Sequence, residues 1–146
     1  MVCGRKSYKM YFNKNIPELD VTNLYNSIKF YKTCGFKIEY ERKEDKFVFL
    51  SLGEIQFMLQ ELATDNMWET GKLEYPFGRG INFQLEVDNV DTIYNSLKAN
   101  GYEIMVEIEE NWYRQDGKLL GCNEFLVQDP DGYLLRFSED LGSKDE

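Results

Sequence analysis

Residues 16–41, IPELDVTNLYNSIKFYKTCGFKIEYE, and residues 82–107, NFQLEVDNVDTIYNSLKANGYEIMVE, carry one pattern twice, at a constant offset of 66 positions and without a gap. Each copy contains an alternating apolar run, a helix cap, a helical apolar stripe, a glycine and a second alternating run. A period this long that occurs only twice is not a solenoid, which stacks three or more short repeats. The sequence therefore predicts a duplicated module whose copies face each other around a shared site. Seven residues are identical between the copies: Leu19, Val21, Asn23, Lys32, Gly35, Ile38 and Glu41 recur as Leu85, Val87, Asn89, Lys98, Gly101, Ile104 and Glu107.

Each module is expected to be strand, helix and three further strands. Alternation predicts the first strands at 16–21 and 81–87. The helices carry apolar stripes at i, i+3, i+4, i+7, formed by Leu24, Ser27, Ile28 and Tyr31 in one and by Val90, Ile93, Tyr94 and Leu97 in the other. Candidate caps and terminating glycines are Thr22 or Asn23 with Gly35, and Asp88 or Asn89 with Gly101. The later strands are expected at 36–42, 47–52, 56–61, 102–109, 123–128 and 133–138, the last preceded by the turn Asp129-Pro130-Asp131-Gly132.

The predicted fold class is α+β, with two βαβββ modules whose curled mixed sheets surround a cleft and whose helices lie outside. The expected organisation is a lead-in at 1–15, a single domain at 16–141 and a C-terminal tail at 142–146. Within the domain, module one spans about 16–62, a linking loop spans 63–80, and module two spans 81–141. The first nine residues are expected to be a polar lead-in.

Composition restricts the classes of partner. The net charge is −9 with no dense basic run, which argues against nucleic-acid binding and is compatible with a cationic ligand. The longest apolar runs are far too short for a membrane span. Three widely spaced cysteines, Cys3, Cys34 and Cys122, indicate reduced thiols, as is usual in the cytoplasm.

Strand periodicity predicts a polar concave face on each sheet, opposite its helix. In the first module this face would carry Ile16, Glu18, Asp20, Gln56, Met58 and Gln60, and in the second Asn82, Gln84, Glu86, Leu134, Arg136 and Ser138. Two such faces confronting each other would form a cleft, where small-molecule sites tend to lie. The alternative is that these residues form the solvated side of an antiparallel sheet.

Four stretches, 16–21, 27–31 followed by Gly35-Phe36, 80–88 and 124–137, together carry a family resemblance; EFLVQDPDGYLLRF at 124–137 is the most specific. Across 16–141 the chain resembles the vicinal-oxygen-chelate superfamily, and within it the glyoxalase/bleomycin resistance protein/dioxygenase family. The resemblance implies the paired βαβββ fold. It also implies four central positions that hold a metal in the enzymatic members, at Ile16, Met58, Asn82 and Arg136.

These four residues do not suit a metal. A catalytic transition-metal site needs about three protein ligands from imidazole, carboxylate or thiolate groups. The chain has no histidine, isoleucine and methionine are unsuitable for a hard divalent ion, and arginine repels one. We therefore expect no metal, no cofactor and no catalytic residues, because Ser–His and Cys–His pairs are also impossible.

The resemblance then implies the metal-free bleomycin resistance branch, whose members sequester a cationic aromatic antibiotic in clefts at a dimer interface. We expect a cytoplasmic homodimer that binds a small-molecule ligand. Rings can stack on Trp or Tyr, and carboxylates can balance cationic groups. Arg136 needs a partner, which could be Glu18, Glu86, Glu124 or an anionic ligand group. The expected ligand-binding residues are Met58, Asn82, Gln84, Trp112, Tyr113 and Arg136.

Two alternatives stay open at this point. One is a glyoxalase-like or dioxygenase-like metalloenzyme with unconventional carboxylate ligands, drawn from Glu18, Asp20, Glu86 and Glu124. The other is a regulatory or interaction module in which side chains fill the groove. The aromatic residues have structural alternatives too: hairpin or interface packing for Trp112 and Tyr113, and loop or dimer packing for Trp68 and Phe77.

Overall fold

The computed structural model describes residues 11–63 and 68–146 of the chain. The polar lead-in expected over the first nine residues lies outside this described part. The first module consists of β1 (Glu18–Val21), α1 (Leu24–Thr33), β2 (Lys37–Arg42), the short helix η1 (Lys43–Asp45), β3 (Phe47–Leu52) and β4 (Ile55–Glu61). The second consists of β5 (Asn82–Glu86), α2 (Val90–Ala99), β6 (Val106–Gln115), β7 (Lys118–Gln128) and β8 (Leu134–Asp145).

Both long helices begin and end where the sequence indicates. The side chain of Asn23 accepts a hydrogen bond from the backbone N–H of Asn26 (3.0 Å), and Asn89 does the same for Thr92 (3.1 Å). These bonds satisfy N–H groups that the first turn of a helix leaves unpaired. Gly35 and Gly101 follow the two helices with φ of +104° and +82°, a backbone conformation that glycine adopts without strain.

The duplication is visible in the strand register. Within the described chain each module forms one four-stranded sheet, ordered β1-β4-β3-β2 and β5-β8-β7-β6. In both sheets the first and last strands of the module are parallel neighbours, and the other pairs are antiparallel. Glu18 lies opposite Met58 in the first sheet, and Gln84 lies opposite Arg136 in the second. Because Glu18 and Gln84 are equivalent in the sequence repeat, this register makes Met58 and Arg136 equivalent positions of the two sheets.

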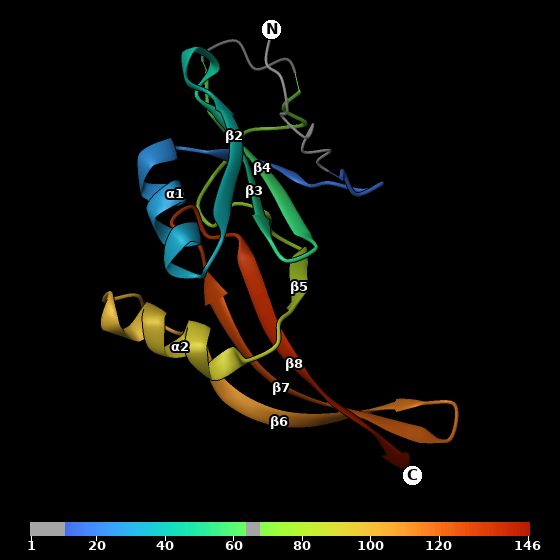
Figure 1. Cartoon of the computed structure of the whole chain (residues 1–146). Coiled ribbons are helices and arrows are strands. Elements are labelled where there is room, and N and C mark those ends of the chain that lie inside the picture. Colours follow the sequence, from blue (N-terminus) through green and yellow to red (C-terminus); the bar gives the residue numbers. More distant parts are fainter. Residues whose placement is uncertain (1–10, 64–67) are drawn as a thin grey trace, which may run out of the picture.

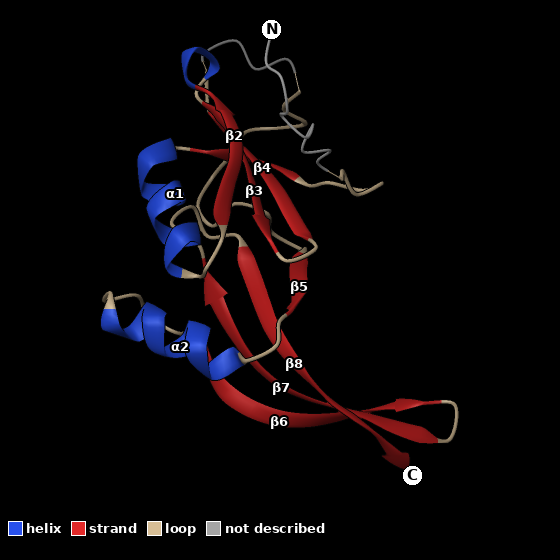
Figure 2. Ribbon diagram, viewed as in Figure 1, coloured by secondary structure: helices blue, strands red, loops and turns tan. Residues whose placement is uncertain are grey.

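The two modules share one apolar core on the helix side of the sheets. Figure 2 shows both helices lying along one side of the strands. Aromatic pairs connect the modules: Phe57 packs edge-on against Phe83 (ring centroids 5.3 Å apart), and Phe30 does so against Tyr102 (5.1 Å). This arrangement confirms the predicted α+β class with helices outside. The opposite face of each sheet, turned away from the helices, is called the inner face below.

The Asp129–Gly132 turn joins the two modules. Its Asp131 side chain accepts hydrogen bonds from the backbone N–H (3.1 Å) and the hydroxyl (2.6 Å) of Thr22 in the first module. Asp129 accepts a bond of 2.8 Å from the hydroxyl of Tyr31, which is fully buried in α1. The sequence predicts this turn, but it does not show that two carboxylates from it enter the first module.

The strands of the second sheet are longer than predicted. β6 begins at Val106 rather than at 102 and continues to Gln115, β7 begins at Lys118, and β8 continues to Asp145. Residues 142–145, expected as part of a tail, therefore belong to β8. The far ends of the three strands form an arm that projects from the body (Figure 1). The hairpin turn at its tip has positive φ at Asp116 (49°) and Gly117 (79°), as a type I′ turn requires.

The linking loop also contributes to the core. Phe77 is buried and packs edge-on against Tyr133 (5.9 Å), so loop packing is its structural role. Trp68, in contrast, is exposed. Neither long helix in the described chain has the length and apolar character needed to cross a bilayer.

Candidate functional site

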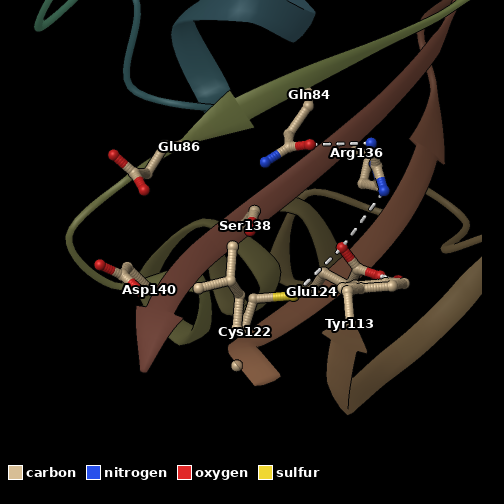
Figure 3. Close-up of a pocket in the computed structure, with 10 residues that line it drawn as sticks. Gln84, Glu86, Tyr113, Cys122, Glu124, Arg136, Ser138 and Asp140 are labelled. Carbon is tan, nitrogen blue, oxygen red and sulfur yellow. Dashed lines mark hydrogen bonds and ion pairs between the residues drawn. The ribbon is translucent and has the colours of Figure 1, made fainter. Parts of the chain in front are cut away.

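A pocket of about 330 Å³ lies on the inner face of the second sheet. Every strand of that sheet contributes to it, because residues two apart along a strand point to the same face. Figure 3 shows the polar side chains converging from β5, β6, β7 and β8. The lining residues are Gln84, Glu86, Tyr113, Leu120, Gly121, Cys122, Glu124, Arg136, Ser138 and Asp140.

The centre of the pocket is the guanidinium of Arg136. Its Nη2 donates to Oε1 of Gln84 (2.8 Å), and its Nη1 lies 3.7 Å from Oε2 of Glu124. Of the three carboxylates that the sequence offered as partners, the structure selects Glu124. The pairing is incomplete, because the Nε–H of Arg136 is buried and has no hydrogen-bond partner in the described part of the chain.

Glu124 is the most heavily bonded group of the pocket. It is buried, and its Oε1 accepts hydrogen bonds from the hydroxyl of Tyr113 and from Nδ2 of Asn111 (3.1 Å). The hydrogen bond to the carboxylate, together with partial burial, raises the pKa of the Tyr113 hydroxyl above its usual value. Tyr113 therefore stays a neutral donor, and Glu124 acts as the fixed anion that balances Arg136.

Cys122 lies beside this pair as a protonated thiol. Its Sγ is 3.5 Å from Oε2 of Glu124 and donates to it. Burial raises the pKa of the thiol, and the neighbouring carboxylate of Glu124 adds to this effect. Because the thiolate is the nucleophilic form, this environment suppresses nucleophilic chemistry at Cys122.

Two further carboxylates stand at the edge of the pocket. Glu86 at the end of β5 and Asp140 in β8 are both exposed, and both line the cavity. Together with Glu124 they give the pocket three carboxylates against the single cation of Arg136. The site therefore carries an excess of negative charge at its mouth.

The pocket contains three of the six predicted binding residues. Gln84, Tyr113 and Arg136 line it. Asn82 is exposed at the start of β5, opposite Leu134. Met58 lies in the first sheet, in the position equivalent to Arg136.

Trp112 lies on the other face of the arm. Neighbouring residues of a strand point to opposite faces, so Trp112 cannot join Tyr113 in the pocket. Its ring packs over Gly121, where a Cβ would come within 2.6 Å of it, and the Nζ of Lys144 lies 3.9 Å from its centroid. Hairpin packing therefore accounts for Trp112.

Several pocket residues were not among the predicted binding residues. Glu86 and Ser138 were predicted on the same concave face as Gln84 and Arg136, but they were not assigned to ligand binding. Asp140 lies beyond the predicted end of its strand, and Leu120 and Cys122 lie before the predicted start of theirs. The pocket also differs from the expected shared cleft, because its lining comes from β5–β8 and includes no residue of the first sheet.

The donor set of this pocket does not fit a divalent metal. Its central group is a guanidinium, and the nearest carboxylate, Glu124, is already bonded to Arg136, Tyr113 and Asn111. Glu18 and Asp20, the other carboxylates considered as ligands, lie on the first sheet. Across residues 11–63 and 68–146, no group of three or more His, Cys, Asp or Glu side chains is arranged to hold an ion.

The fold and the sequence agree on a family. The model for the Glyoxalase/Bleomycin resistance protein/Dioxygenase superfamily matches residues 17–137, so the chain belongs to that superfamily. A comparison with curated protein sequences found no match.

Solved structures share the fold at low sequence identity. A protein from the mobile metagenome of V. Pseudocholerae superposes with a TM-score of 0.65 at 17% identity, over 90% of this chain and 96% of that one. TioX from Micromonospora sp. ML1 superposes with a TM-score of 0.64 at 18% identity, over 86% of this chain and 97% of that one. A bleomycin resistance determinant encoded on the transposon Tn5 superposes with a TM-score of 0.59 at 19% identity, over 89% of this chain and 99% of that one. At these identities the likeness establishes the fold alone.

Proposed function

We propose that this chain is a metal-free, non-enzymatic protein that sequesters a small cationic ligand in the pocket on its second sheet. The observation that carries the proposal is the Arg136–Glu124 ion pair. The family resemblance assigns position 136 to a metal ligand in the enzymatic members, and in this chain a salt-bridged guanidinium occupies that position. A salt-bridged guanidinium can orient a ligand, but it cannot replace the Lewis acidity of a metal ion. A binding role, in contrast, requires only groups that contact a ligand, such as the side chains of Arg136 and Glu124.

The chemistry of the pocket defines the ligand. The exposed carboxylates of Glu86 and Asp140 favour a cationic group at the mouth. The ring of Tyr113 offers a surface for a planar aromatic group. The partly exposed side chain of Arg136 can donate to an acceptor on the ligand. A cationic aromatic antibiotic combines these features, and the shared fold with a bleomycin resistance determinant supports this choice.

We further propose that the protein acts as a homodimer in the cytoplasm, with the pocket opening onto the dimer interface. Tyr113 is 47% exposed and Leu120 is 39% exposed, and both lie on the arm at the edge of the pocket. A second subunit covering this edge would bury apolar surface and convert the open pocket into a groove. Sedimentation equilibrium tests the dimer: a mass of one 17.3 kDa chain at micromolar concentration would contradict it.

Calorimetric titration with bleomycin tests the binding proposal. Wild-type protein in EDTA should give saturable heat, and the double variant Glu86→Gln, Asp140→Asn should bind about 10-fold more weakly, since two partly exposed charge contacts are lost. The double variant Glu44→Gln, Asp45→Asn, an equal charge change on η1 in the other module, should bind like wild type. Absence of heat with bleomycin and with a panel of cationic aromatic compounds would refute sequestration. An equal loss in all variants would show a general charge effect rather than a site.

A further inference from the structure

The inner face of the first sheet is aromatic where that of the second is polar. Val48 and Leu50 of β3 belong to the shared core, so the alternate residues Phe47 and Phe49 point to the inner face. By register, Phe47 occupies the position that Glu124 occupies in the second sheet. The polar face expected here from the sequence is therefore only partly polar, because Phe47 lies opposite Gln60 and Phe49 lies opposite Met58.

Phe49 is buried although it faces away from the core. Only 1% of its surface is exposed, because two rings cover it. Tyr40 of β2 stacks on it nearly parallel, with centroids 5.3 Å apart, and Phe12 meets it edge-on at 5.4 Å. Phe12 belongs to the irregular segment before β1, so a piece of the chain outside both modules completes this aromatic cluster.

One glutamine side chain holds the backbone on both sides of Phe12. The Nε2 of Gln56 donates to the carbonyl of Tyr11 (2.6 Å), and its Oε1 accepts from the backbone N–H of Asn13 (2.8 Å). The Asn13 side chain adds a bond to the carbonyl of Glu54 (2.6 Å). This pairing of one donor and one acceptor resembles the contact that a neighbouring strand would make with an extended peptide.

The segment is held by few contacts. Phe12 remains 54% exposed and Tyr11 82% exposed, so neither side chain is anchored in the core. Its hydrogen bonds are exposed to water, where each contributes little net free energy, and ordering the segment costs conformational entropy. The described contacts that hold the segment are therefore exposed hydrogen bonds and one ring contact.

We propose that the inner face of the first sheet is a docking site for an extended peptide with a central aromatic residue, and that residues 11–13 are its built-in occupant. The ring cluster of Phe49 and Tyr40 selects the aromatic side chain, and Gln56 selects an extended backbone with a free C=O before the ring and a free N–H after it. A segment tethered in the same chain has a high effective concentration, so a separate peptide must displace it. This inference does not depend on the ligand pocket of the second sheet.

Fluorescence anisotropy with a labelled peptide of residues 8–16 tests the proposal on the full chain. Wild-type protein should bind the peptide weakly, and Phe12→Ala, which releases the segment, should bind it about 10-fold more tightly. Adding Gln56→Ala to that variant should abolish the gain, and a peptide that lacks the phenylalanine should not bind. Tyr25→Ala, which removes another exposed ring, that of a residue on α1, should behave like wild type.

Two outcomes would overturn the proposal. One is equal peptide affinity in wild type and Phe12→Ala, and the other is a gain that Gln56→Ala leaves unchanged. A thermal unfolding scan establishes that each variant is folded. If Phe12→Ala is not folded, Phe12→Leu, which keeps apolar contact but removes the ring, should show a smaller gain, and no gain in that variant would count against the docking site.

Discussion

Replacing Arg136 by methionine gives the second sheet the residue that the first sheet carries at the equivalent position, Met58. The substitution leaves Glu124 buried and charged with no cation beside it. Two unit charges about 4 Å apart attract by about 4 kcal/mol at an effective dielectric constant of about 20. The Arg136 side chain is 29% exposed and its Nη1 lies 3.7 Å from the carboxylate, so water partly screens the pair. We therefore expect a coupling energy of about 1–2 kcal/mol.

A double-mutant cycle measures this coupling. Urea unfolding at neutral pH, followed by circular dichroism, is carried out on wild type, Arg136→Met, Glu124→Gln and the double variant. Arg136→Met should lower the free energy of unfolding by about 2 kcal/mol. The loss in the double variant should be about 1–2 kcal/mol smaller than the sum of the losses in the two single variants. A matched cycle on the exposed ion pair Lys72–Glu74, whose atoms are closer at 3.4 Å, should show almost no coupling. If the two cycles agree, the idea that Glu124 is the fixed counter-ion of Arg136 is refuted.

Three other predictions concern the stability of the folded chain. Burial raises the pKa of Asp129 to about 6, above its unfolded value, so its protonation stabilises the folded state at low pH and this stability is lost as the pH rises through 6. When the pH is lowered from about 8 to about 4, the free energy of unfolding of wild type, measured in urea, should therefore rise by on the order of 2–3 kcal/mol relative to that of Asp129→Asn. A difference between the two proteins that stays constant with pH would contradict this. Tyr31→Phe removes the hydroxyl that donates to Asp129 and should cost about 1–3 kcal/mol at pH 7, whereas an unchanged urea midpoint would show that the bond is unimportant. Gly121→Ala places a Cβ 2.6 Å from the ring of Trp112 and should cost about 1–3 kcal/mol, whereas Gly71→Ala, with open space around it, should cost almost nothing; equal melting temperatures would refute the packing described for the arm.

The sequence determines the module architecture well, because its signals are local. The predicted bounds of β3, 47–52, are those observed, and the capping residues Asn23 and Asn89 were among the candidates. The arm was missed because its strands are held by backbone pairing, and the alternation on which the prediction relied is broken by charged residues around 107–118. One signal was available: Asp116-Gly117 is a strong indicator of a two-residue hairpin turn.

The candidate site was predicted in part for the same reason. Strand alternation alone places Gln84 and Arg136 on one face. The cost of burying a cation indicates that Arg136 needs a partner, and the structure supplies Glu124 among the candidates. Asp140 could not be found from the pattern because its strand continues past the predicted end. Phe12 covers the inner face of the first sheet through its contact with Phe49. These two residues are 37 positions apart along the chain, so no local periodicity encodes their contact.

The metal content of the purified protein tests whether the second-sheet pocket binds its ligand without a metal. The full-length protein is produced in medium supplemented with zinc, nickel, manganese and iron, purified without chelators, dialysed and analysed by inductively coupled plasma mass spectrometry. Because the pocket offers a guanidinium and an already paired carboxylate instead of three free ligands, the content of every transition metal should be far below one ion per chain, in wild type and in Glu124→Gln alike. One tightly held transition-metal ion per chain, lost in Glu124→Gln, would contradict the claim and would favour a metalloenzyme.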